Sequence, residues 1–456
     1  MIVRDLEAPA HVLRSLAAHQ PERYPVLLES TAEGPLGRFS VLMAEPSGAL
    51  WCDAGGRVGA AAVPPAVPGG GGFLDALGRW WEAERCLEAG LPHPFHGGWA
   101  VFLAYEIAAE IEPRLTLPPA AFPWRAFALR IPCALVHDRL QGKTRLIAEP
   151  SAAGSIGRIE ADVRAAARGG GADTGGPLGL ADIEEEPPEA YLERVRRAKA
   201  YIAAGDIYQT NLSRPWRAHL PHGCGIGALY ERLCAANPAP FAALAQWRGG
   251  AILSSSPERL LRVAGSRIDT RPIAGTRPRS RRPGEDGSEM AALSGHPKER
   301  AEHIMLIDLE RNDLGRVCEP GTVRVDELMS IESYAHVHHI VSNVSGLLRA
   351  GTTPIDALRA VFPGGTITGC PKVRCMQIIA ELEREGRGAY TGSLGWLGRD
   401  GSLDFNILIR TFCVSGGALE VRAGAGIVAD SDPARELEET RAKARGLLAA
   451  LERSAP

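Results

Sequence analysis

The alternation of apolar and polar residues divides the chain into a β-rich first third and a longer part in which strands and helices alternate. Short apolar runs predict strands at residues 26–30 and 39–43, and a longer run predicts a central buried strand at residues 97–106. A proline- and glycine-rich loop is expected at residues 64–72, and residues 152–167 have an amphipathic pattern. The first third therefore predicts strands with interspersed helices.

A boundary in the sequence lies at residues 169–188. This segment opens with three glycines and closes with three glutamates and two prolines, and little between them is apolar enough to be buried. We therefore divide the sequence into an N-terminal region at residues 1–168, a linker, and a C-terminal region at residues 189–456. We expect the two regions to pack as one body, as the family resemblance described below implies.

The C-terminal region begins with apolar residues at helical spacing, a pattern that predicts a helix ending at Gly205. A strand is predicted at residues 207–213. The last helix should begin at Asp432 and Pro433, because aspartate caps helix N-termini and proline favours the first helical position. The regular rhythm and glycine-rich turn of a nucleotide-binding sheet are missing, so periodicity alone predicts only a mixed α and β fold.

Composition excludes several classes of partner. The 456 residues are 45% hydrophobic and 23% charged, which is ample for a packed core. A net charge of −3 gives no electrostatic reason to bind nucleic acid or an anionic membrane. No run of about 18 apolar residues predicts a membrane span, and the first residues lack the order of a signal peptide. The nine scattered cysteines suit free thiols, so we expect a cytoplasmic protein.

A candidate ligand site lies near the C-terminus, where Gly424 and Gly426 precede the last predicted helix. Glycine has no Cβ, so the backbone can approach a ligand closely there. Glu436 and Glu439 are three residues apart, hence on one helix face, and Lys443 follows one turn later. These groups suit a hard cation together with an anionic small molecule; an exposed helix with ordinary charge pairs is the alternative.

A second pair of glutamates has the same spacing. Glu299 and Glu302 precede an apolar helical run, and they too should share one helix face. Two facing helices with such pairs would form an oxygen-rich cage suited to Mg²⁺, an ion that keeps several waters and is usually shared with the substrate. The sequence therefore predicts Mg²⁺ as the cofactor.

Several motifs, taken together and in order, resemble those of the chorismate-utilising enzymes. That family contains anthranilate synthase component I, aminodeoxychorismate synthase component I, and the isochorismate and salicylate synthases. The resemblance is strong over residues 189–452 and weaker before them. It implies an α+β fold with a large two-sheet antiparallel, sandwich-like core and helices outside. The motifs lie at residues 256–259, 271–277, 308–316, 338–342, 362–376, 409–411 and 423–443.

The resemblance implies roles for individual residues. Glu258 would be the general acid that protonates the departing C4 hydroxyl of chorismate; a surface ion pair with Arg259 is the alternative. Arg410 would bind the enolpyruvyl carboxylate through its guanidinium. The remaining assignments are Mg²⁺ ligands at Glu302 and Glu439, water-mediated or substrate contacts at Glu299 and Glu436, substrate contacts from Lys443, Gly424, Ala425 and Gly426, and a ring site lined by Thr276 and His339. For His339 a structural role is the alternative.

The nucleophile is expected to be ammonia. Members of the family that add water carry a lysine where this chain has Gln209, which argues against isochorismate or salicylate synthesis. Ammonia is mostly protonated at cytosolic pH, a difficulty that a glutaminase delivering NH₃ would remove. The sequence contains no Gly-x-Cys-x-Gly nucleophile turn, so we expect a separate glutamine amidotransferase subunit.

Two ammonia-using branches of the family remain, and the residues divide between them. Ala274 replaces the lysine with which many aminodeoxychorismate synthases attack C2, and this resembles anthranilate synthases. Asn211, His338 and the pair Gly364-Gly365 resemble the aminodeoxychorismate branch. We favour a lysine-less aminodeoxychorismate synthase component I that serves para-aminobenzoate and folate synthesis. Anthranilate synthase component I is the alternative, and a non-catalytic regulatory subunit that binds chorismate or an amino acid is a third.

A regulatory pocket is a further expectation. Leu28, Glu29 and Ser30 resemble the segment that helps form the tryptophan feedback pocket of anthranilate synthases. Pro240 and Phe241 lie in the second segment of that pocket, although the Tyr-Met pair typical of it is missing. A plain core strand is the alternative interpretation.

Overall fold

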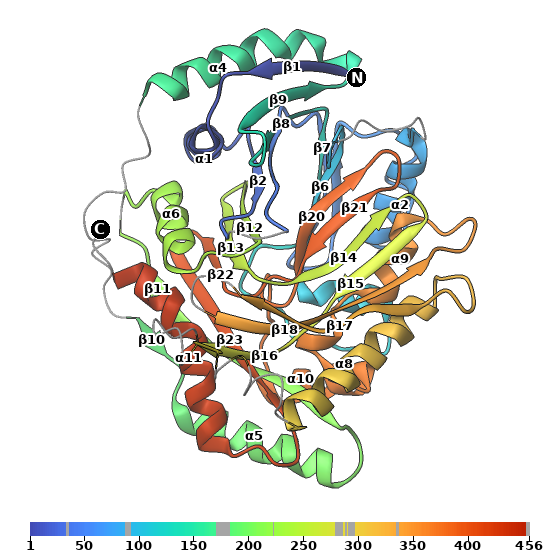
Figure 1. Cartoon of the computed structure of the whole chain (residues 1–456), viewed down its shortest axis with the longest axis vertical. Helices are drawn as coiled ribbons and strands as arrows, with labels where there is room; N and C mark the ends of the chain where they lie inside the picture. The colour runs from blue at the N-terminus through green and yellow to red at the C-terminus, as the bar shows by residue number, and fades with distance from the viewer. Residues whose placement is uncertain are drawn as a thin grey trace.

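The fold places helices on the outer faces of two large antiparallel sheets (Figure 1). The computed structural model describes residues 1–32, 36–86, 93–169, 183–221, 223–278, 286–287, 290, 297–333 and 337–452. Within these residues every pairing between named strands is antiparallel, which confirms the expected α+β fold with a two-sheet core.

The first sheet has twelve strands in the described chain. From one edge to the other they are β1 (Ile2–Leu6), β9 (Lys143–Ala148), β8 (Cys133–Asp138), β3 (Phe39–Ala44), β2 (Val26–Glu29), β12 (Phe241–Trp247), β13 (Gly250–Ser256), β22 (Thr411–Ser415), β23 (Ala418–Ile427), β11 (Gln209–His219) and β10 (Glu184–Glu185), with β19 (Gly369–Cys370) also paired to β11.

The second sheet has eleven strands in the described chain. They are β16 (Ile273–Pro278), β18 (Val337–Leu347), β15 (Arg267–Arg271), β14 (Arg259–Ala264), β21 (Leu403–Asn406), β20 (Ser393–Gly398), β6 (Gly98–Leu103), β7 (Trp124–Ile131), β4 (Gly48–Asp53) and β5 (Val58–Ala61), with β17 (Arg324–Ser333) paired to β18.

The helices cover both outer faces (Figure 1). Those against the first sheet are α1 (Ala10–His19), α4 (Ile156–Arg168), α6 (Ile226–Ala236) and α11 (Pro433–Glu452). Those against the second sheet are α2 (Phe73–Glu84), α8 (Pro297–Gly315) and α9 (Pro354–Val361). The others are α3 (Ala108–Ile111), α5 (Pro188–Ala203), α10 (Lys372–Glu383) and the 3₁₀ turns η1 (Tyr105–Ile107), η2 (Pro150–Ser155) and η3 (Gly365–Ile367).

Apolar side chains fill the spaces between these layers. Phe102 and Trp396 of one sheet and Val41 and Ile252 of the other belong to one buried cluster, which lies between the sheets. Further clusters lie beneath the helices on each outer face, and a smaller one joins α5, α10 and α11 to the strands β11 and β23. Burial of this apolar area stabilises the fold and holds β11 and β23 rigidly in place.

The N-terminal and C-terminal regions contribute to both sheets. In the first sheet Leu27 of β2 is opposite Leu244 of β12, and in the second Val101 of β6 is opposite Gly395 of β20. Residues 170–182, most of the expected linker, lie outside the described residues. The rest of the linker includes the short strand β10 and the start of α5.

The predicted elements are confirmed with small shifts in their ends. The predicted central strand is β6, where every residue is buried, but the chain leaves the strand for η1 at Tyr105. Helix α5 ends before Gly205, which has a left-handed φ of 81°. Helix α11 begins at Pro433, and the Asp432 carboxylate accepts a hydrogen bond from the Arg435 amide at 3.0 Å.

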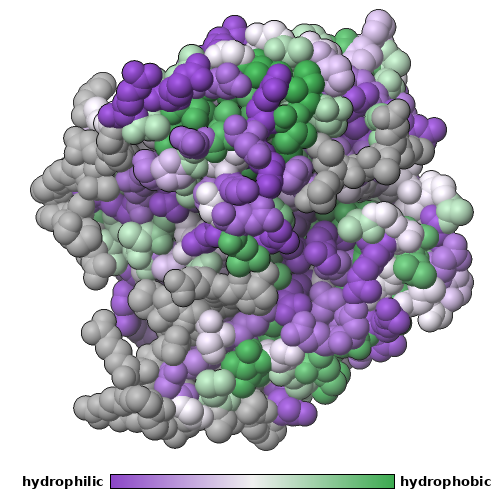
Figure 2. Space-filling model, turned by 45° about the horizontal axis from the view of Figure 1, so that its top comes forward, coloured by the Kyte–Doolittle hydropathy of each residue, from purple (hydrophilic) through white to green (hydrophobic). Residues whose placement is uncertain are grey.

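A membrane-spanning helix needs both length and an apolar surface. None of the described helices is both long and apolar enough to cross a bilayer. On the face in Figure 2, hydrophilic residues predominate and hydrophobic residues form separate patches.

Candidate active site

Glu258 lies in the turn between β13 and β14, and its side chain is buried at 3% exposure. The Ile273 amide donates to its carboxyl at 3.3 Å. Arg259, the partner that a surface ion pair would need, instead binds Asp404 through two hydrogen bonds of 2.9 and 3.1 Å. Glu258 is therefore a buried carboxyl rather than half of a surface ion pair with Arg259.

The protonation of Glu258 is set mainly by burial, which raises its pKa from 4.5 to about 8. The negative charge of Glu310 raises this pKa further, whereas the Ile273 amide and the positive charge of Lys443 lower it. The Thr366 hydroxyl lies beside the carboxyl without a well-formed hydrogen bond, yet near enough to favour the ionised form. At neutral pH Glu258 is thus mostly protonated and able to act as a general acid.

Arg410 precedes β22 with a left-handed φ of 52°, a conformation that costs energy for a residue with a Cβ. Its pKa is lowered by burial, with the charge of Glu258 acting in the opposite direction. Its guanidinium makes no hydrogen bond or ion pair with another described residue, and its carbonyl accepts from the Ser255 amide at 3.0 Å. A desolvated guanidinium near an acidic carboxyl can bind a ligand carboxylate.

His339 and Ala274 lie on the neighbouring strands β18 and β16. His339 is buried, and burial, together with the positive charge of Arg410, lowers its pKa to about 3, so it is neutral at physiological pH. In the register of these strands His339 is opposite Thr276, whose side chain lies outside the described residues. Ala274 is opposite Ile340 and buried, so this position offers no nucleophile.

Gly424 and Gly426, which precede the last helix, lie within the strand β23 and face polar side chains of other elements. A Cβ on Gly426 would come within 2.5 Å of the Gln209 Nε2 atom and 3.3 Å of the Glu302 Oε1 atom. A Cβ on Gly424 would come within 2.8 Å of the Tyr390 hydroxyl. Only glycine therefore fits at these two positions without displacing neighbours. Ala425, between them, is fully buried.

Helices α8 and α11 each place charged side chains at this end of β23. Glu302 of α8 accepts a hydrogen bond from Gln209 Nε2 at 2.7 Å. Lys443 of α11 donates to the Gly424 carbonyl at 3.0 Å and pairs with Glu439 at 2.8 Å. Glu439 is half-exposed and Glu436 is buried.

The expected Mg²⁺ cage is not assembled among the described residues. They contain no group of three or more histidine, cysteine, aspartate or glutamate side chains placed to hold a metal ion. The side chain of Glu299 lies outside them. A Glu302 oxygen nevertheless lies beside the bare backbone of Gly426, and Glu439 pairs with Lys443, which binds the Gly424 carbonyl. The carboxylate oxygens of Glu302 and Glu439 are the donor chemistry that suits a hard cation.

The two segments expected to form a regulatory pocket lie side by side, because β2 pairs with β12. Glu29 is already engaged, however: its carboxylate accepts from Arg14 at 2.8 Å and from Tyr230 at 2.9 Å. The Ser30 hydroxyl donates to the Ala32 carbonyl at 2.9 Å, and Phe241 packs beneath Arg259. These contacts are what a plain core strand would also make.

Sequence reasoning missed two neighbours of these residues. Tyr390 points its hydroxyl at Gly424, and Glu310 of α8 is a buried carboxylate close enough to raise the pKa of Glu258. Glu310 lies inside the quoted motif at residues 308–316, which carried no individual assignment. The available signal was its place on the apolar face of the helix, three or four residues from Leu306, Ile307 and Leu314.

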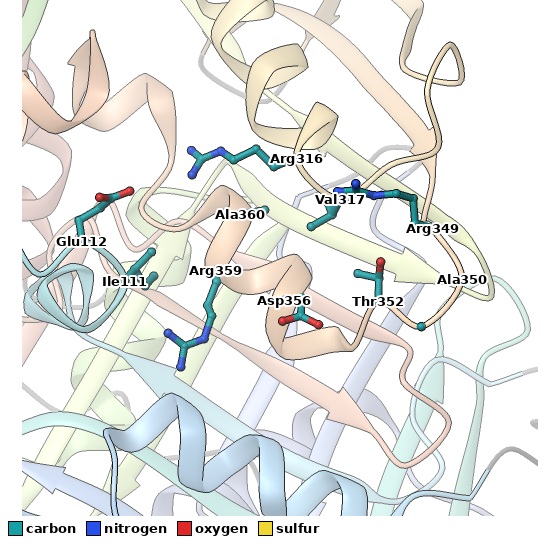
Figure 3. Close-up of a pocket in the computed structure, with 11 residues that line it drawn as sticks. Ile111, Glu112, Arg316, Val317, Arg349, Ala350, Thr352, Asp356, Arg359 and Ala360 are labelled. Atoms are coloured by element: carbon teal, nitrogen blue, oxygen red, sulfur yellow. The ribbon is translucent and has the colours of Figure 1, made fainter.

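Two surface cavities lie elsewhere. One, of about 630 Å³, is lined by three arginines: Arg359 of α9, Arg316 just after α8, and Arg349 before α9 (Figure 3). The other, of about 760 Å³, is lined by residues that include Glu84, Arg130 and others near η2. None of the residues predicted from sequence lines either cavity.

Comparison with known proteins gives one consistent result. Residues 76–449 match the family described as chorismate binding enzyme. Anthranilate synthase component 1 of Thermus thermophilus is 41% identical over 461 residues, covering 98% of this chain and 96% of that protein. Aminodeoxychorismate synthase component 1 of Bacillus subtilis is 49% identical over 267 residues, covering 58% and 56%. The crystal structure of anthranilate synthase component I from Streptococcus pneumoniae superimposes with a TM-score of 0.78 at 29% identity, covering 91% and 93%.

Proposed function

The chain belongs to the chorismate binding enzyme family, and we propose that it aminates chorismate at C4, the reaction of an aminodeoxychorismate synthase component I. The observation that carries this proposal is the buried, protonated Glu258 close to the guanidinium of Arg410, which makes no hydrogen bond or ion pair with another described residue. The net reaction replaces the C4 hydroxyl with an amino group and releases water.

The chemistry follows from the substrate. Chorismate carries a ring carboxylate, a C4 hydroxyl and an enolpyruvyl carboxylate. Hydroxide is a poor leaving group, so the C4–O bond breaks readily only as Glu258 delivers its proton to that oxygen. Arg410 and Lys443 would bind carboxylate oxygens and orient the ring, while neutral His339 lines the site without adding charge. Burial of Glu258 keeps bulk water from competing for its proton.

Mg²⁺ is the cofactor that the family implies. Glu302 and Glu439 would hold it, with Glu299 and Glu436 nearby. When bound, Mg²⁺ supplies positive charge that neutralises and fixes the substrate's ring carboxylate. The hydrogen bond from Gln209 keeps the Glu302 carboxylate beside Gly426 of β23.

Ammonia is the proposed nucleophile. Gln209 donates to Glu302 and, as an amide, is not a base that could activate water. The relatives are named as component 1, which is consistent with a separate subunit. We propose that this partner is a cytoplasmic glutamine amidotransferase that supplies NH₃.

Anthranilate synthesis is the second candidate, and two observations favour it. Ala274 gives no covalent nucleophile at the position where many aminodeoxychorismate synthases use lysine, and a relative that matches nearly the whole chain is named anthranilate synthase component 1. C4 amination without that lysine would need water or another group to add at C2 as the C4 hydroxyl departs as water, and that group to leave C2 again as ammonia adds at C4.

Product analysis separates the two candidates. The protein would be incubated with chorismate, Mg²⁺ and an ammonium salt, with aminodeoxychorismate lyase added, and the products separated by chromatography. 4-Aminobenzoate is the expected product. Anthranilate would show the second candidate to be right, and unchanged chorismate would rule out both.

A further inference from the structure

Glu310 is a buried carboxylate on α8, just over two turns beyond Glu302, and only 2% exposed. Two elements donate to it. The Thr270 hydroxyl of β15 lies 3.0 Å from one oxygen, and the Gly365 amide of η3 lies 3.3 Å from the other. Glu310 thus ties a strand of the second sheet to the η3 turn.

Both tied segments lead directly to Glu258. Three residues after Thr270, the Ile273 amide donates to the Glu258 carboxyl. One residue after Gly365, Thr366 lies beside the same carboxyl. A Cβ on Gly365 would come within 2.5 Å of Leu309 and 3.0 Å of Glu310 Oε1, so α8 packs directly on the bare backbone of the turn. Movement of Glu310 would therefore shift both neighbours of Glu258.

The charges around Glu310 are arranged to leave it partly ionised. Lys372 is hydrogen-bonded to Asp313 and donates to the Val361 carbonyl at 3.0 Å. Its positive charge therefore acts on Asp313 as well as on Glu310. Burial and the negative charge of Asp313 raise the pKa of Glu310 to about 7, and Lys372 opposes them. Around Glu258 itself, Glu310 is the negative neighbour, and Arg410 and Lys443 are the positive ones.

We infer that Glu310 is a positioning residue for the general acid: it fixes the Gly365–Thr366 and Thr270–Ile273 segments against Glu258, and its negative charge adds to burial in keeping Glu258 protonated. This inference rests on the proposed function. A general acid loses activity as the pH rises through its pKa. Removing the negative charge should lower that pKa and move the alkaline limb of the pH–rate profile to lower pH.

The test is the pH dependence of kcat/KM for chorismate, measured with Mg²⁺ at one fixed concentration of free NH₃. Glu310→Gln should move the alkaline limb by about half a pH unit or more toward acid. Glu310→Asp keeps the negative charge, but its shorter side chain cannot hold both hydrogen-bond donors. This variant should therefore have a lower kcat and an alkaline limb near the wild-type position. Asp308→Asn removes an exposed carboxylate from the same helix and should leave the limb unchanged.

The outcomes separate the possible failures. An active wild-type protein whose limb stays in place in Glu310→Gln would overturn the inference but not the proposed function. A wild-type protein that consumes no chorismate would overturn the proposed function itself. Should Glu310→Gln fail to fold, Thr270→Val takes its place. Loss of the hydrogen bond from the Thr270 hydroxyl makes Glu310 harder to ionise. The alkaline limb of Thr270→Val should therefore move toward acid, by less than in Glu310→Gln. An unshifted limb in Thr270→Val would also overturn the inference.

Discussion

Replacing Glu258 with glutamine should make the folded protein more stable near neutral pH while removing most of its activity. In the folded state burial raises the pKa of this carboxyl to about 8, whereas the unfolded chain has the ordinary value of 4.5. Below pH 4.5 the carboxyl is protonated in both states and carries no electrostatic cost. As the pH rises from 4.5 to 8, ionisation increasingly favours the unfolded chain.

The size of the effect follows from that window. Each pH unit above 4.5 costs the wild-type fold about 1.4 kcal/mol of unfolding free energy until the folded carboxyl itself ionises. At pH 7 this loss of unfolding free energy is at most about 3 kcal/mol. A neutral glutamine of nearly the same shape avoids it, so the stability advantage of the variant should be absent near pH 4.5 and grow with pH.

Urea unfolding of both proteins at several pH values between 4.5 and 8 measures this difference. Glu193→Gln, which changes an exposed carboxylate on α5, is the matched control and should show no such growth. A Glu258→Gln difference that stays constant with pH would refute the reasoning, because it would mean that Glu258 ionises normally in the fold. In the same variant kcat should fall by about 10² to 10⁴ with little change in substrate affinity, since the proton is needed only in the transition state.

Three further predictions concern the rest of the site. Glu302→Gln and Glu439→Gln should each reduce Mg²⁺-dependent turnover by about 10² or more without lowering thermal stability, and wild-type rates in both would contradict the metal assignment. The isolated chain should use ammonium salts, faster at higher pH where NH₃ is abundant, and should not use glutamine; glutamine-dependent turnover without a partner would contradict the separate subunit. Mass spectrometry of wild-type protein quenched during turnover should show the unmodified mass, whereas Ala274→Lys should allow a chorismate-derived adduct; an adduct on the wild-type protein would show that another side chain acts as nucleophile.

Local patterns predicted the elements of this fold better than their arrangement. The strands near residues 26 and 39, the helix ended by Gly205 and the Asp432 cap were all readable, because propensity, glycine and capping act over a few residues. The pairing of β2 with β12 joins residues more than 200 positions apart, and no local period encodes it. The resemblance to a known family implied only that two antiparallel sheets form the core and that both regions belong to one body.

The site shows the same division. The residue types of Glu258, Glu302 and Arg410 were visible in the sequence, but their partners were not. Gln209, which binds Glu302, is 93 residues away from it in the sequence. Asp404, which binds Arg259 in place of Glu258, is 145 residues away from Arg259. The charge state of a carboxyl depends on such distant partners and on burial, which is why the protonation of Glu258 needed the structure.

The central claim, amination of chorismate at C4, is tested most directly with ¹⁵N-labelled ammonium. The protein would be incubated with chorismate, Mg²⁺ and the labelled salt, and the purified product examined by ¹H–¹⁵N correlation NMR without any coupling enzyme. We expect one ¹⁵N atom bonded to ring carbon C4, with the enolpyruvyl group retained. Label at C2, loss of pyruvate to give anthranilate, or a product without label would contradict this claim.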